Sequence, residues 1–149
     1  MKNVQISLSD NLNLITIKNL CESPNSIVSF LEENGMNLVT CNIRPSGLID
    51  IIFIAEDTQI LKISSHFTSF SPVHNTVTIR SGVSCVLISF QEVETYHCEP
   101  VTSFFEQENV CIERIIVSKN RVEVFFPASE VCGSVRNFVE KLEEHLNRQ

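Results

Sequence analysis

The sequence of 149 residues contains no tryptophan, one tyrosine, two methionines and four glycines, so its ten phenylalanines supply most of the aromatic core. Long apolar runs are missing as well. Residues Met1 to Asp10 alternate apolar and polar side chains and hold no stretch of the length that a signal peptide or a membrane-spanning helix requires. We therefore expect a globular, cytoplasmic protein that does not bind a membrane.

Positive charge is also scarce. Lys and Arg together number 11 against 18 Asp and Glu, which gives a net charge of −7, and the basic residues form no run. Affinity for nucleic acid comes largely from clustered basic side chains that neutralise phosphates. The composition therefore predicts that nucleic acid is not a partner.

Signatures of catalysis and of metal binding are missing too. The sequence holds no Gly-x-Ser-x-Gly, no phosphate-binding loop and no C-x-x-C pair. Cys98 beside His97 is the nearest approach to a catalytic pair, but adjacent residues of a strand or loop usually point apart. The six isolated cysteines lie mostly in apolar runs, which favours buried thiols over disulfides or metal ligands. We expect no enzymatic activity, no metal and no cofactor.

One stretch of the chain occurs twice. Ser23 to Leu38 has a weaker copy in Glu99 to Ile112, and the two are 74 residues apart, counted from Ser29 to Ser103. A period of about half the chain predicts two small domains rather than a solenoid. Because domains of this size are marginally stable alone, we expect a shared interface or a homodimer to bury further surface.

The first half predicts the order strand, helix, strand, strand, helix, strand. Ser23 is a good helix N-cap, Pro24 suits the first helical position, and Gly35 ends the helix. Apolar periodicity and turn residues define the other elements. They are strands at 14–17, 36–43, 48–55 and 76–79, a short helix at 56–65, a turn at 10–13 and a loop at 69–75.

The second half repeats this order without the last strand. Its elements are a strand at 84–90, a loop at 91–98, a helix at 99–108, hairpin strands at 111–118 and 121–126, and a long terminal helix. The alternating segment Val4 to Leu8 precedes the first repeat and is the simplest source of the missing strand. We therefore assign residues 10–81 to a first domain and 82–149 to a second, with strand 4–8 completing the sheet of the second.

This element order is that of ferredoxin-like folds. Two such units, whose helices end at Gly35-Met36-Asn37-Leu38 and Asn109-Val110-Cys111-Ile112, resemble the tandem ACT domains of aspartate kinases. Leu14 to Lys18, and Arg121 to Phe126 with the long helix that follows, extend the resemblance over nearly the whole chain. It implies an α+β fold of two ferredoxin-like ACT-type domains, interleaved through the N-terminal strand, and a regulatory module without the kinase domain.

The resemblance also implies a ligand site, because ACT domains often bind an amino acid at an interface between units, through the loop after the first strand and the start of the second. In this chain these positions are Asn19, Glu22, Ser23, Asn25 and Ser26 on the loop, and Asn37, Leu38, Val39 and Thr40 on the strand. A helix N-terminus suits the carboxylate of an amino acid, and an acidic or amide oxygen suits its ammonium group.

The loops differ from the family pattern at one point. The Pro-Gly pair that opens the helix in the family aligns here with Cys21-Glu22 and with Thr95-Tyr96, so neither loop has the glycine. Plain helix capping by residues 23–26 is therefore the alternative interpretation of this segment.

Together these features predict a non-catalytic regulatory module that binds a small effector, expected to be an amino acid, at an ACT-domain interface, and that forms a homodimer. The alternative is a ligand-free subunit that mediates dimerisation or docks on a metabolic enzyme.

Overall fold

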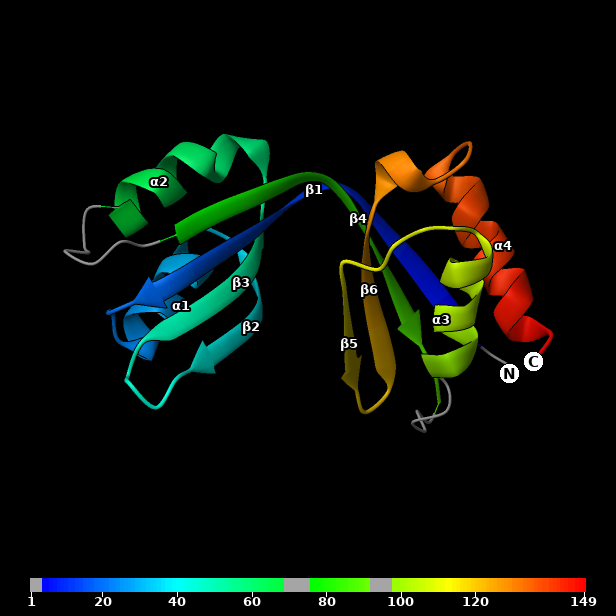
Figure 1. Ribbon diagram of the computed structural model, residues 1–149, viewed down its shortest axis with the longest axis horizontal. Helices are drawn as coiled ribbons and strands as arrows, with labels where there is room; N and C mark the ends of the chain where they lie inside the picture. Colours follow the sequence, from blue (N-terminus) through cyan, green and yellow to red (C-terminus); the bar gives the residue numbers. More distant parts are fainter. Residues whose placement is uncertain (1–3, 69–75, 92–97) are drawn as a thin grey trace. The chain divides into compact units, whose positions relative to one another are not determined.

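The computed structural model describes residues 4–68, 76–91 and 98–149, and in these ranges the chain forms an α+β fold (Figure 1). The elements are β1 (Gln5–Leu20), α1 (Pro24–Glu33), β2 (Asn37–Ile43), β3 (Ile49–Ala55), η1 (Asp57–Gln59), α2 (Ile60–Thr68), β4 (Thr76–Ser89), α3 (Cys98–Gln107), β5 (Arg114–Ser118), β6 (Arg121–Pro127), η3 (Ala128–Glu130) and α4 (Val135–Asn147). No helix within these ranges is long and apolar enough to cross a membrane.

The described residues divide into two compact units. Unit 1 consists of Met1–Asn11 and Gly82–Gln149, and unit 2 of Leu12–Ser81. The strands follow the hydrogen-bonded order β2-β3-β1-β4-β6-β5. Unit 2 therefore takes the order β2-β3-β1-β4, and unit 1 takes β1-β4-β6-β5, because β1 and β4 each continue from one unit into the other. Both are ferredoxin-like orders, which confirms the predicted fold class.

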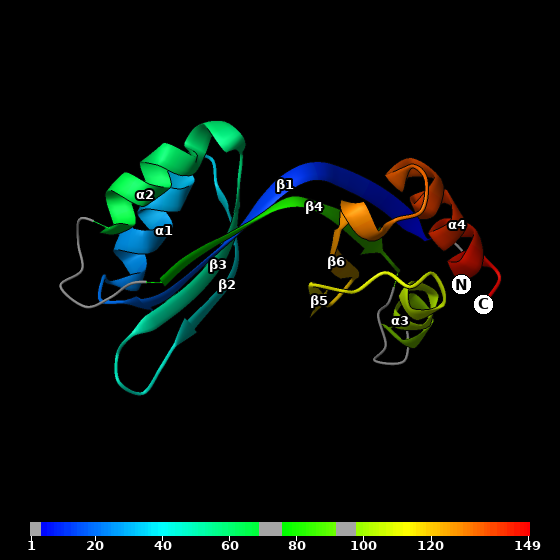
Figure 2. The same ribbon diagram turned by 45° about the horizontal axis from the view of Figure 1, so that its top comes forward.

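Each unit packs two helices on one face of its strands (Figure 2). In unit 2, Ile27 and Leu31 of α1 and Ile63 and Phe67 of α2 are buried against the alternating face of β3. In unit 1, the core consists mainly of residues from α3, α4, β4 and β6, and Val4 belongs to it, with Ile6 and Leu8 packed against it. The beginning of β1 and the residue before it thus contribute apolar side chains to unit 1, the unit that contains α4.

Two predicted breaks between strands are wrong. The sequence predicts a turn at 10–13 and separate strands at 76–79 and 84–90, whereas β1 and β4 each run through without interruption. Asn11 and Gly82 instead adopt positive φ angles of 53° and 67° inside the strands. Asp10 Oδ1 accepts hydrogen bonds from Asn11 N (3.0 Å) and from the buried Ser84 Oγ (2.5 Å), so these turn-forming residues stabilise a strand irregularity.

Both helix exits use the same backbone motif. Gly35 N donates to Glu32 O and Met36 N to Leu31 O, at 3.1 and 2.9 Å, with φ of 66° at Gly35. One repeat later, Asn109 has φ of 56°, and the bonds from residues 109 and 110 to Glu106 O and Phe105 O measure 3.1 and 3.0 Å. These are Schellman caps, in which glycine and asparagine accept the left-handed conformation most readily.

The burial predicted for the cysteines is wrong for most of them. All six thiols are free, and only Cys85 is buried, where desolvation raises its pKa to about 12. Cys98 is partly buried at the start of α3, while His97 lies outside the described residues. The exposed thiols are Cys21, Cys41, Cys111 and Cys132. Cys41 lies on the edge strand β2 and the others lie in connections, so an apolar neighbourhood in sequence does not bury them.

We propose that the two units are also folding domains with the predicted boundaries, 10–81 and 82–149 with strand 4–8. Deletion of residues 1–9 should then lower amide hydrogen-exchange protection in Ser84–Ser89 and in α4 of unit 1, because apolar contacts of Val4, Ile6 and Leu8 are lost. The double variant Gln5→Ala Ser7→Ala, at exposed positions of the same strand, should leave protection unchanged. Protection lost only around Ile17 would contradict the assignment.

Gly35→Ala should destabilise the protein by about 1 kcal/mol, which is the approximate cost of a left-handed conformation for a residue with a Cβ. A Cβ at Gly35 has no neighbouring atom within 4 Å, so the cost comes from the backbone and not from a clash. Gly35→Asn should cost clearly less, as the asparagine at position 109 indicates. Urea unfolding measures both variants, and equal losses would rule out this explanation.

Candidate functional site

Asn19, the first predicted ligand residue, is held in a polar cluster at the end of β1. Its φ is 65°, and its backbone N donates to Asp50 Oδ1 at 3.0 Å. Arg44 Nη2 donates to Asn19 Oδ1 and lies 3.1 Å from Asp50 Oδ1. The cluster ties the end of β1 to the β2–β3 hairpin, so the loop that begins at Cys21 starts from a fixed point.

Glu22 points toward the helices of unit 2. Its Oε1 lies 3.4 Å from Nε2 of His66, and the imidazole of His66 stacks on Phe30 with ring centroids 3.8 Å apart and planes 11° apart. The side chain of Glu22 is 11% exposed, and its Oε2 atom is buried without a hydrogen-bond donor among the described residues. A buried carboxylate oxygen without a donor is energetically unfavourable, and a bound cationic group would relieve that cost.

Ser23 caps α1, as the sequence predicts for a helix start. Ser26 N donates to Ser23 Oγ at 3.2 Å, and Ile27 N donates to Ser23 O at 3.2 Å. The side chains of Asn25 and Ser26 are exposed in the first turn. The loop therefore has a structural function at Ser23 and presents polar side chains to solvent at the next positions.

The predicted strand residues lie on β2, the edge of the sheet in unit 2. Asn37 and Leu38 are exposed, and Val39 and Thr40 are partly buried. They lie far from the loop, because Asn37 and Leu14 both face Ile54, whereas Ile43 and Leu20 both face Ile49. Counted along β3 from Ile49, at about 3.3 Å per residue, the partner of Asn37 lies about 17 Å from the loop end of the sheet and the partner of Thr40 about 10 Å.

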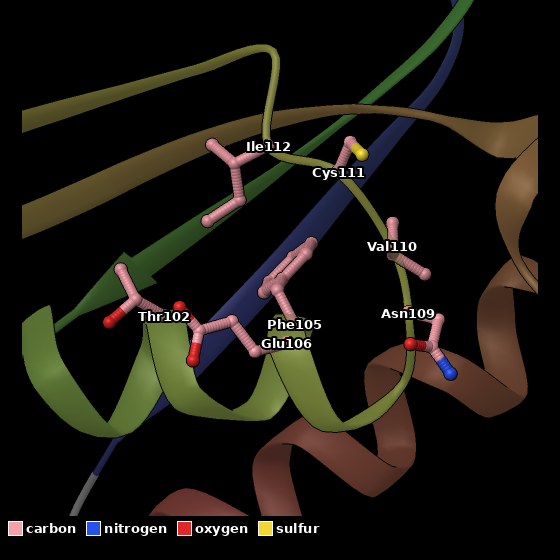
Figure 3. A pocket seen from close by; sticks show the side chains of 7 residues that line it. All are labelled: Thr102, Phe105, Glu106, Asn109, Val110, Cys111 and Ile112. Atoms are coloured by element: carbon pink, nitrogen blue, oxygen red, sulfur yellow. The ribbon is translucent and has the colours of Figure 1, made fainter.

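A pocket of about 420 Å³ lies in unit 1, at the end of α3 and along the segment that leads to β5 (Figure 3). Its lining residues are Thr102, Phe105, Glu106, Asn109, Val110, Cys111 and Ile112. The ring of Phe105 rises from the helix toward Ile112, and Thr102 and Glu106 stand beside it on the helix (Figure 3). Its volume falls within the range of small-molecule sites, with an apolar floor and a polar rim.

Cys111 lies at the mouth of this pocket as a neutral thiol. Its backbone N donates to Glu130 Oε1 at 3.1 Å. The hydrogen bond of the thiol to Glu130 and the negative charge of that carboxylate raise the pKa of Cys111. Because the thiolate is the nucleophilic form, the raised pKa lowers the reactivity of this residue at neutral pH.

Sequence reasoning missed the pocket, although the internal repeat contained the signal for it. At the offset of 74 residues, Cys111 and Ile112 are the counterparts of Asn37 and Leu38, and Glu106 is the counterpart of Glu32. Two of the four predicted strand positions of unit 2, Asn37 and Leu38, thus correspond to pocket positions in unit 1. Transferring the prediction from one repeat to the other would have found it.

Comparison of sequences identifies no relative of this chain. No family profile matches it, and no curated protein sequence does. Comparison of folds gives many matches.

The regulatory subunit of aspartate kinase from Thermus flavus superposes with a TM-score of 0.69 at 13% identity, over 94% of this chain and 95% of that one. The aspartate kinase of Clostridium acetobutylicum gives a TM-score of 0.73 at 18% identity, over 97% of this chain and 34% of the kinase. E. coli aspartokinase III in complex with lysine and aspartate gives 0.62 at 13% identity, over 95% of this chain and 32% of that one.

These matches confirm the resemblance that the repeat and the element order indicated. The chain corresponds to nearly the whole length of a separate regulatory subunit and to about a third of complete kinases. It therefore has the ACT-type fold of the regulatory region of aspartate kinases.

Proposed function

We propose that this protein is a regulatory module that binds an α-amino acid between two copies of the chain. The observation that carries the proposal is the separation of the predicted site residues within unit 2, where Asn37 and Leu38 begin β2 at the end of the sheet opposite to the 19–26 loop. A single amino acid is much shorter than this separation. A ligand that contacts both segments must therefore take the loop from one unit and the strand from another.

The chemistry of the loop supports an amino acid as the effector. The N-terminus of α1 provides a positive dipole end for a carboxylate, next to the exposed side chains of Asn25 and Ser26. Glu22 supplies the carboxylate of the loop, and its Oε2, which is buried without a donor among the described residues, would accept an ammonium group once the side chain turns outward. The carboxylate of the amino acid would face the N-terminus of α1, and its ammonium group would face Glu22. These protein groups lie within four residues of each other in sequence.

The edge strand supports the second copy. Within the described residues β2 pairs with β3 alone, so its other edge is available for pairing. Leu38 and Ile43 on this strand are 40% and 57% exposed. Exposed apolar residues on an unpaired edge are characteristic of strands that pair with another chain. A homodimer through β2 would cover them and bring in a second set of 37–40 residues.

Regulation follows if the effector binds one arrangement of the two copies more tightly than another, because a ligand shifts an equilibrium only by its difference in affinity. The E. coli aspartokinase III structure with the same fold holds lysine and aspartate, which makes these two amino acids the first candidates.

A thermal-shift screen of the common amino acids tests the proposal. A ligand at 100 times its dissociation constant stabilises the folded state by about 2.7 kcal/mol, and at least one amino acid should produce a clear increase in Tm. If none does so in a dimeric sample, the protein is instead a ligand-free interaction subunit.

The binding loop is tested by the double variant Asn25→Ala Ser26→Ala, which should weaken the amino acid identified by the screen at least tenfold in titration calorimetry. The two side chains are exposed, so stability should change little. Unchanged affinity would mean that another loop binds the ligand.

Capping and ligand binding at Ser23 are separated by a matched pair of variants. Ser23 caps α1 and Ser134 caps α4, each by accepting from the backbone N three residues ahead, at 3.2 and 3.1 Å. Ser23→Ala and Ser134→Ala should each lower the unfolding free energy by about 1 kcal/mol. We expect Ser23→Ala, but not Ser134→Ala, to weaken binding of the amino acid. If both variants bind the amino acid with equal affinity, Ser23 has the capping role only.

A further inference from the structure

The α3 pocket in unit 1 has an electrostatic character that differs from that of an amino-acid site. Among the described residues that line it, none is Lys, Arg or His, and one, Glu106, is a carboxylate. Its floor is apolar, because Phe105 and Val110 are buried and Ile112 is partly buried. A ligand in this pocket meets apolar surface on one side and, on the other, the carboxylate of Glu106, which forms no ion pair with the described residues.

The end of helix α3 adds to this negative potential. The helix ends at Gln107, so the pocket lies beside the negative end of the helix dipole. Three backbone N–H groups of the lining are already used, since residues 109 and 110 donate to the helix carbonyls and Cys111 N donates to Glu130 Oε1. A ligand carboxylate would meet repulsion from Glu106 and from the helix end, with the side-chain amide of Asn109 as a donor in the lining.

Thr102 completes the polar rim. Its hydroxyl donates to Glu99 O at 3.1 Å, so its lone pairs remain to accept a hydrogen bond. Thr102 and Glu106 are four residues apart on α3 and lie on the same face of the helix (Figure 3). Together they offer acceptors to one donor group of a ligand that lies over Phe105.

We propose that this pocket binds an organic ammonium ion, a primary amine with a compact apolar body. The ammonium group lies against the carboxylate of Glu106 with Thr102 as a second acceptor, and the apolar body lies between Phe105 and Ile112. The net charge of −7 favours the approach of cations to the protein as a whole. The pocket belongs to unit 1 and the proposed effector loop to unit 2, so this inference does not rest on the proposed function.

Methyl NMR of the full chain with labelled isoleucine tests this proposal, since Ile112 lines the pocket and Ile43 lies on the edge strand of unit 2. The probes share one apolar body and differ in charge: 3-methylbutylamine, 3-methylbutanol and 3-methylbutanoate, with leucine as the zwitterion. The amine should shift the Ile112 methyl signal in a saturable way without shifting Ile43. The alcohol should bind several-fold more weakly, and the carboxylate and leucine should leave Ile112 unshifted.

Two variants separate the charge from the cavity. Glu106→Gln should weaken binding of the amine by up to about fivefold, which is the range that an exposed ion pair supports. It should leave the affinity for the alcohol unchanged. Glu32→Gln is the matched control, because Glu32 is exposed at the equivalent position of α1, and it should change neither affinity.

The proposal would be overturned by no saturable shift of Ile112 with the amine, by equal binding of amine and alcohol, or by an amine affinity that Glu106→Gln does not change. Binding of leucine or 3-methylbutanoate at Ile112 as tight as that of the amine would also overturn it. None of these results bears on the Ser23 loop, which the amino-acid screen tests independently.

Discussion

The continuity of β1 and β4 through both units is the constraint on which the rest of the structure depends. Strands of 16 and 14 residues are much longer than the five or six residues typical of globular proteins. Each strand contributes one part to unit 1 and the other part to unit 2. Unit 1 therefore cannot complete its sheet without the start of the chain. The positive φ angles at Asn11 and Gly82 let the strands pass from one unit to the other without a loop.

This constraint also fixes where the candidate sites lie. In each ferredoxin-like unit the helix that follows the first strand must return the chain to the opposite end of the sheet before the next strand begins. The loop at Ser23 and the strand start at Asn37 are therefore separated by the length of α1. The same geometry in unit 1 places the α3 pocket at the helix exit, where Phe105 and Ile112 face one another.

The sequence predicted the elements that depend on local chemistry. The N-cap at Ser23, the helix exit at Gly35 and the 119–120 hairpin turn all follow from the residues present, and the structure confirms them. It failed where a local signal has two structural uses. Asp10 and Asn11 are turn formers, yet Asn also accepts a positive φ inside a long strand, and the sequence alone does not distinguish these cases.

Burial and tertiary contacts were harder to predict than the elements themselves. Cys41 belongs to a predicted strand, and Cys111 has apolar neighbours in sequence. They are exposed because Cys41 lies on an edge strand and Cys111 in a connection, and edge position depends on strand order. The contact between Glu22 and His66 joins residues 44 positions apart, and no periodicity signals it. The ligand-binding role of the 19–26 loop and of the 37–40 segment stays a prediction, since it follows from the resemblance and not from local chemistry.

The central claim is that an amino acid is bound between two copies of the chain. Sedimentation velocity over a dilution series, with and without the amino acid that raises the Tm, tests it most directly. The account predicts that the amino acid shifts the monomer–dimer equilibrium toward the dimer, by a factor that grows with its concentration. Saturable binding of the amino acid to the monomer, with no change in the dimer dissociation constant, would contradict it.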